Sequence, residues 1–259
     1  MSNIRFFYNN LFDLAYQVTP SSENDNFPAS NLQNRFRTKV WRTAGATPGT
    51  ANLIINHGAE KAVASIILAN YSWASAPGTL NLEFNNLDSW GAPAHSESLS
   101  WAATPDAYGN QNVIVKCFAS QAYRYNRLNV VYSPNEIPAD WDLGRIFLGT
   151  YFEPENNFEY GGVENPIDPS YIARSVDGQE HIDEITGYRE REFVFPFESA
   201  AQWLQFQQVF NRIGISRDLF IAFDYDAYPN DLTMYGKITR FNQVSNFYHA
   251  IAMGFRESR

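Results

Sequence analysis

Short runs of β-forming residues, separated by turn-rich segments, constrain the fold of this chain more than any other feature. Six such runs lie in the first half, at residues 4–8, 52–56, 63–69, 79–84, 112–119 and 125–132. Pro, Gly, Ser and Asn are concentrated between them, and no long helical pattern occurs before residue 140. Strands at this spacing predict a β-sandwich.

The second half has a different pattern. Residues 133–142 contain two prolines and three acidic residues, the composition of an exposed connection, so we predict domains 1–138 and 139–259. Further strands are expected at 145–152, 189–197, 219–226, 234–241 and 247–255. The polar stretch 161–170 predicts a long loop or a hairpin tip.

Residues 199–213 predict the main helix of the chain. Ser199 and Gln202 have the spacing of a capping box, and Gly214 is placed to end the helix. One face is apolar and consists of Trp203, Phe206, Phe210 and Ile213. The expected fold class is therefore mainly β, with a sandwich followed by a β-rich α+β domain with one main helix.

Charge and composition exclude several classes of function. The formal net charge is −9, and residues 141–259 alone hold 18 acidic and 10 basic side chains. Nucleic-acid binding needs clustered Lys and Arg, so no sequence-specific nucleic-acid partner is expected. The single cysteine, Cys117, allows no internal disulfide and fits folding in a reducing cytoplasm. Neither a signal peptide nor membrane insertion is expected, because no stretch is apolar enough.

The sequence holds no motif with strong catalytic logic, so we expect neither a catalytic site nor a cofactor. No metal site is expected, because the four histidines are far apart and Asp224, Asp226 and Asp231 lack the Gly and distal Glu of an EF-hand. A hydrolase hypothesis rests only on the carboxylate pairs Glu190 with Glu192 and Glu153 with Glu155.

Four aromatic residues in or beside turn-rich stretches are the candidate ligand-binding residues. They are Trp73, Trp90, Trp101 and Tyr108. Flat rings beside polar groups hold sugar rings or anchor protein partners, and interface packing or core capping is the alternative for each. Trp41 is instead predicted to lie in the core.

The motifs FPASNLQNRFRTKVWRTAG (27–45), NLIINHGAEKAVASIILANYS (52–72), TLNLEFNNLDSW (79–90) and AYRYNRLNVVYS (122–133) resemble discoidin-type, galactose-binding-like domains. The resemblance covers about residues 25–133 and implies a jelly roll in which a Gly-containing turn joins two strands after the Trp. Such domains often bind sugars or lipid head groups through loops at one end, and some hold a calcium ion. No ligand-binding triad of that family is matched here.

Pro-Ala-Ser-Asn-Leu and Trp-Arg-Thr, together with the segments 144–161 and 235–257, resemble minor tail or tail-tip proteins, of the distal tail or baseplate type, of long-tailed bacteriophages. The resemblance implies a structural protein of the virion tail, made in the host cytoplasm. Its partners would be its own copies in a ring, other tail proteins and a host glycan. The alternative function is a carbohydrate-binding module for host-surface glycans.

Overall fold

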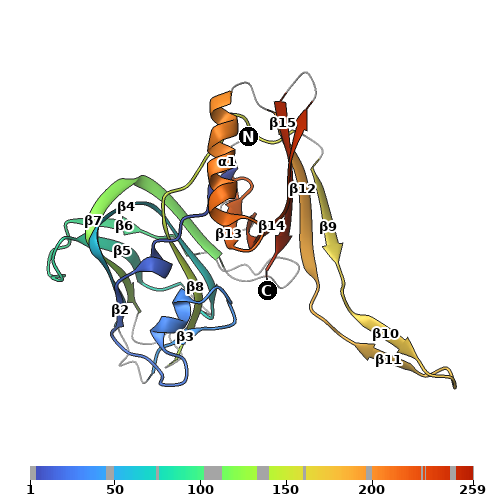
Figure 1. Ribbon diagram of the computed structural model, residues 1–259. Helices are drawn as coiled ribbons and strands as arrows, with labels where there is room; N and C mark the ends of the chain where they lie inside the picture. The colour runs from blue at the N-terminus through green and yellow to red at the C-terminus, as the bar shows by residue number, and fades with distance from the viewer. Residues whose placement is uncertain are drawn as a thin grey trace. The chain divides into compact units, whose positions relative to one another are not determined.

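The chain is mainly β, and it divides into two units (Figure 1). The computed structural model describes residues 4–44, 50–73, 76–101, 113–132, 140–159, 162–196, 200–228, 230, 232–245 and 249–258. Unit 1 comprises Met1–Phe152 and Ile221–Thr233, and unit 2 comprises Glu153–Phe220 and Met234–Arg259. The predicted fold class, a β-sandwich followed by a β-rich unit that contains a helix, is confirmed.

The units divide at a different point from the predicted boundary after residue 138. Strand β8 (Asp142–Gly149) pairs with β4 (Thr50–Tyr71), and so it completes the sheet of unit 1. Residues 221–233 also belong to unit 1, where the Tyr225 hydroxyl accepts a hydrogen bond from the backbone N–H of Cys117 at 2.7 Å. The proline-rich composition marks a connection, but that connection lies between two strands of one sheet.

The sheet of unit 1 has the order β3-β8-β4-β7-β5-β6, and β2 also pairs with β4. Every one of these pairings is antiparallel. The other elements of unit 1 are β1 (Arg5–Phe7), η1 (Phe12–Leu14), β2 (Gln17–Pro20), η2 (Ala29–Gln33), β3 (Trp41–Arg42), β5 (Thr79–Asn85), β6 (His95–Ser98) and β7 (Val113–Val131).

Two long, bulged strands replace four of the predicted short ones. The runs at 52–56 and 63–69 are parts of β4, and those at 112–119 and 125–132 overlap β7. The expected turn between the first two is instead a register shift between Asn56 and Lys61 within the β4–β7 ladder. Gly58 lies in this shift with φ +77°, where a Cβ would be strained, so it allows a bulge where the pattern predicts a turn.

The core of unit 1 is rich in large aromatic and branched side chains. Trp41 is fully buried, as predicted, and packs edge-on against Trp141 with ring centroids 5.0 Å apart. Inward-facing positions alternate along the strands, for example Leu80, Leu82 and Phe84 on β5. The period-2 pattern therefore gives the core face of each strand correctly.

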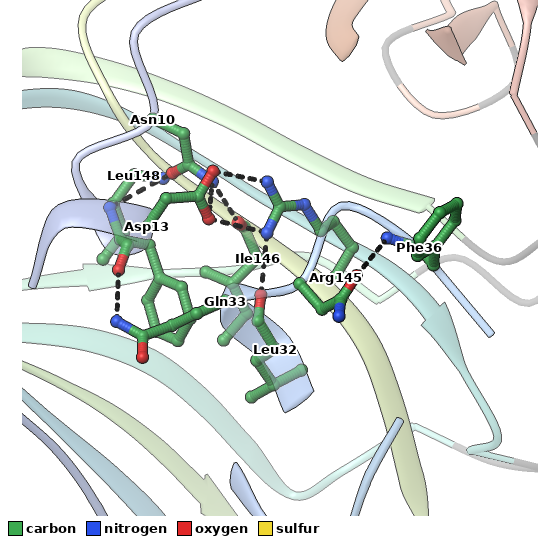
Figure 2. Close-up of polar contacts among 10 residues, drawn as sticks. Asn10, Asp13, Leu32, Gln33, Phe36, Arg145, Ile146 and Leu148 are labelled. Carbon is green, nitrogen blue, oxygen red and sulfur yellow. Dashed lines mark hydrogen bonds and ion pairs between the residues drawn. The ribbon is translucent and has the colours of Figure 1, made fainter. Parts of the chain in front are cut away.

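A buried ion pair fastens the N-terminal segment to β8 (Figure 2). The two terminal nitrogens of Arg145 each donate to an oxygen of Asp13 at 2.6 Å, and one of them also donates to the Leu32 carbonyl at 2.8 Å. Asn10 donates to the Asp13 carboxylate and accepts from the backbone N–H of Leu148. Arg145 is only 4% exposed, so this network replaces the water that its charge loses.

In the sheet of unit 2, β14 pairs with β15, β15 with β12, and β12 with β9, and these three pairings are antiparallel. The elements are β9 (Val163–Ile167), β12 (Tyr188–Pro196), α1 (Ala200–Ile213), β13 (Asp218–Ala222), β14 (Thr233–Ser245) and β15 (His249–Glu257). Helix α1 packs on the sheet through aromatic contacts, with Phe206 4.9 Å from Phe195 and Phe210 4.3 Å from Phe241 between ring centroids.

The predicted helix is confirmed, and it ends as the sequence predicts. Phe206 and Ile213 are buried on the predicted face, and Val209 is buried with them. Gly214 has φ +58°, and its N–H donates to the Phe210 carbonyl at 2.6 Å. Ser199 of the predicted capping box lies outside the described residues.

A two-stranded arm extends from the sheet of unit 2 (Figure 1). We define the arm as residues 163–187. It begins as β9 paired with β12 and continues as β10 (Tyr171–Arg174) paired with β11 (Glu180–Asp183). None of its side chains is buried. The sequence predicts a long loop or hairpin tip for part of this segment, and the structure extends the hairpin over the whole of it.

Candidate functional site

The candidate site lies around Trp90, in the connection between β5 and β6. The indole N–H of Trp90 donates to the Asp88 carboxylate at 2.7 Å. The guanidinium of Arg127, on β7, lies over the indole ring, 4.8 Å from its centroid. Trp90 remains partly exposed. The ring is thus fixed at its polar edge and against one cation.

Strand pairing places the groups that hold Arg127. Glu83 on β5 lies directly opposite Arg127 on β7, and the next outward-facing pair is Asn81 with Asn129. The Glu83 carboxylate accepts from Arg127 Nε at 2.6 Å and from Asn129 Nδ2 at 3.1 Å. Glu83 is only 6% exposed, so it positions Arg127 rather than facing solvent. We call Glu83, Asp88, Trp90, Arg127 and Asn129 the Trp90 cluster.

A second set of hydrogen bonds holds the same connection at its beginning. Asn86 donates to the Glu60 carboxylate at 2.9 Å and accepts from the backbone N–H of Arg124 at 3.1 Å. Arg124 in turn donates to Asn56 at 3.3 Å. The segment that carries Trp90 is therefore tied to both β4 and β7. A fixed connection keeps the entropy cost of ordering Trp90 low when a ligand binds.

The chemistry of the Trp90 cluster suits a polyhydroxylated ligand. An aromatic ring offers apolar contact, while Asp88 offers acceptors and Arg127 and Asn129 offer donors. Sites that combine an apolar surface with a few fixed polar groups orient small ligands.

Of the other three predicted ligand residues, Trp73 and Trp101 pack in or against the core of unit 1. Trp73 is 4% exposed and stacks on Tyr71 at 4.6 Å, so its ring belongs to the core, and it is no longer a candidate. Trp101 packs against the core, and its buried indole N–H has no partner within the described part of the chain. Tyr108 lies outside the described residues.

Glu83, Asp88, Arg127 and Asn129 were not predicted from the sequence. The alternation around Leu82 and Leu128 does place Glu83, Arg127 and Asn129 on the outer face of their strands. Their register is a tertiary property, however, because it depends on the pairing of β5 with β7.

The described residues offer no cluster of three or more His, Cys, Asp or Glu side chains that could hold a metal ion. The Asp224 carboxylate, in the turn after β13, accepts a hydrogen bond from the backbone N–H of Ala227. Asp231 lies outside the described residues. Of the carboxylates considered for hydrolysis, Glu155 accepts a hydrogen bond from Gln202 at 2.7 Å. Within the described part of the chain, no helix is long and apolar enough to span a membrane.

His57 is the buried titratable side chain nearest to the bulge of β4. Its Nε2 lies 2.6 Å from the Asn126 side-chain oxygen. Burial lowers the pKa of His57 below its ordinary value, although the hydrogen bond to Asn126 opposes the shift and Lys61 adds to it. The contact joins β4 to β7, so His57 has a structural position away from the Trp90 cluster.

No protein-family model matches the chain, and no curated protein does. Solved structures similar to it include chitosan-binding module 1 from a chitosanase/glucanase of Paenibacillus sp. IK-5, with 20% identity over 55% of this chain and 99% of that chain, and a TM-score of 0.40. A fucose-binding module of Streptococcus pneumoniae, SpX-3, has 12% identity over 56% and 99%, and a TM-score of 0.42. The CBM32 of AlyQ in complex with 4,5-unsaturated mannuronic acid has 16% identity over 52% and 94%, and a TM-score of 0.38.

Proposed function

We propose that unit 1 binds carbohydrate through the Trp90 cluster. The observation that carries this function is the fixed, partly exposed indole of Trp90, with Asp88 at its N–H and Arg127 over its ring. The similar solved structures add no weight, because their TM-scores are near 0.4. Support comes from the side-chain geometry of this chain alone.

The expected ligand is a pyranose whose apolar ring face packs on the indole. Neighbouring hydroxyl groups of such a sugar accept from Arg127 and Asn129 and donate to Asp88. Glu83 contributes indirectly, because it fixes the guanidinium of Arg127 on the outer face of the sheet. The number of polar groups is small, so selectivity depends on the positions of two or three hydroxyls.

A glycan array followed by calorimetric titration of the best ligand tests this function. Trp90→Ala removes the ring and is expected to weaken binding at least about tenfold, since buried aromatic contacts dominate such interfaces. Leu87→Ala, in the same connection and 71% exposed, is the matched control and leaves affinity unchanged. An array with no signal for the wild-type chain, or equal affinity in Trp90→Ala, rejects the proposal.

A second function, a subunit of the tail tip or baseplate of a bacteriophage particle, is favoured by the arm of unit 2. A two-stranded hairpin without buried side chains is marginally stable alone in water, so an ordered arm suits a protein that works in an assembly. Electron microscopy of purified particles labelled with an antibody against this chain tests the role. Label absent from the tails of particles that encode the chain contradicts it.

A further inference from the structure

Exposed large apolar side chains occur on two surfaces of unit 2. Among its described residues, six of them lie on the arm and two lie along or just after α1. The arm carries Val163, Tyr171, Ile172, Val176, Ile182 and Ile185, and the helix surface carries Leu204 and Ile215. Exposed apolar surface of this kind marks sites of protein contact.

The arm is a formed hairpin with an apolar pair across its two strands. Ile172 and Ile182 pair directly across β10 and β11, and each is 58% exposed. Beside them Arg174 donates to Glu180 at 2.7 Å. The tip is closed by the backbone N–H of Ser175, which donates to the Gln179 carbonyl at 2.8 Å, and Gly178 takes φ +85° there. The apolar pair is thus held in place for a partner.

The two surfaces have opposite charge. The arm holds six carboxylates, and its basic side chains are Arg174 and His181. The carboxylates are those of Glu164, Asp168, Asp177, Glu180, Asp183 and Glu184. Helix α1 contains no acidic residue, and its exposed stripe of Leu204, Gln208 and Arg212 continues to Ile215. Arg217 is exposed and donates to the Arg212 carbonyl at the end of the helix.

We infer that the arm of one copy docks on the outer face of α1 in a second copy of this chain. Apolar side chains occur on both surfaces, and the carboxylates of the arm complement Arg212 and Arg217. Two arms packed together would instead place like charges side by side.

Docking of an arm on a helix is a head-to-tail contact. Each copy then has one arm that docks on a neighbour and one helix face that binds the arm of another neighbour. The assembly is a ring if the rotation between neighbouring copies returns to the first copy, and a filament if it does not. This inference rests on the second function, assembly, and is independent of carbohydrate binding. It names the surface on which the arm of a neighbouring copy docks.

The test uses two variants of the full chain. The arm variant, Ile172→Thr with Ile182→Thr, keeps β-branched residues in the strands but removes apolar surface. The helix-face variant, Leu204→Gln with Arg217→Glu, keeps a good helix former at position 204 and reverses one charge just after the helix. The wild-type chain is expected to assemble at micromolar concentration in native mass spectrometry, and each variant is expected to be monomeric, with self-association weakened at least about tenfold.

Mixing the two variants provides the decisive measurement. The arm variant retains an intact helix face and the helix-face variant an intact arm, so the mixture is expected to form a 1:1 heterodimer and nothing larger. An arm-to-arm contact would give no heterodimer, and that result overturns the inference. A monomeric wild-type chain overturns both the inference and the assembly function. Assembly that survives both variants overturns the inference alone.

A control variant addresses a different docking surface. Phe36 is 49% exposed in unit 1, and two basic residues near it in the sequence, Arg35 and Lys39, are also exposed. Phe36→Ser is expected to leave assembly unchanged. If Phe36→Ser abolishes assembly while the helix-face variant assembles normally, the arm docks on unit 1 and the inference is wrong.

Discussion

The β4–β7 pair in unit 1 and the β10–β11 pair in the arm of unit 2 are both antiparallel strand pairs, yet they bury opposite shares of their side chains. Along β4 and β7, one face enters the core, whereas no residue of the arm is buried. Strand pairing is similar in both, so the difference shows that hydrogen-bonded registers alone do not stabilise a sheet. Burial stabilises β4 and β7, and the arm lacks this contribution.

The largest expected effect of a single substitution lies on β7. Leu128 is 1% exposed and lies opposite Leu53 on β4 and Leu82 on β5. We expect Leu128→Ala to lower the free energy of unfolding by about 2 to 5 kcal/mol, because it removes buried apolar surface and leaves a cavity. Urea denaturation measures the change. A loss below about 1 kcal/mol would mean that β7 does not depend on this core contact.

A slightly smaller effect is expected where the N-terminal segment meets β8. Asp13→Ala leaves the guanidinium of Arg145 buried beside the Leu32 carbonyl without its carboxylate. The free energy of unfolding should fall by about 2 to 4 kcal/mol, because the buried guanidinium loses both hydrogen bonds to the carboxylate. Asp13 itself is one-third exposed, which keeps the effect below that of a fully buried pair. Equal thermal stability of Asp13→Ala and wild type would contradict this account.

Elements that pack on a core are predicted from the sequence, whereas the arm, which has no buried side chain, is not fully predicted. The apolar stripe of residues 199–213 and Gly214 are local signals, and both the helix and its end are confirmed. The core position of Trp41 is confirmed for the same reason, since it depends on a large aromatic residue in an apolar context. An element with a buried face therefore has a periodic apolar pattern in the sequence, and this pattern predicts the element.

Elements without a buried face leave no such pattern. The arm contains Pro166, Pro169, Gly178 and several acidic residues, so its composition predicts a loop, and its pairing depends on contacts 6 to 12 residues apart. Strands β2, β3 and β6 are only two to four residues long and were missed as well. In the Trp90 cluster only Trp90 was predicted: Asp88 is two residues away in the same connection, but Glu83, Arg127 and Asn129 come from strands that only the β5–β7 pairing brings together.

An effect of intermediate size on the free energy of unfolding is expected from His57, which is buried on β4, and this effect depends on pH. Burial lowers the pKa of His57 from its unfolded value of 6.5, so the unfolded chain takes up a proton that the folded chain does not. Stability contributed by neutral His57 is present above pH 6.5 and is lost as pH falls below it. His57→Gln should flatten the fall in unfolding free energy between pH 7 and pH 5. An identical pH profile in the variant would remove His57 as the cause.

The smallest effect is expected on the arm, provided that assembly is prevented. In the background of the helix-face variant, Ile182→Ala should change the free energy of unfolding by less than about 0.5 kcal/mol, because Ile182 is 58% exposed and has no core to leave. The same substitution in the wild-type background should weaken self-association, since there Ile182 meets a second copy. Urea denaturation and native mass spectrometry measure the two effects. A loss above about 1 kcal/mol in the monomer would show that the arm is stabilised from within its own chain.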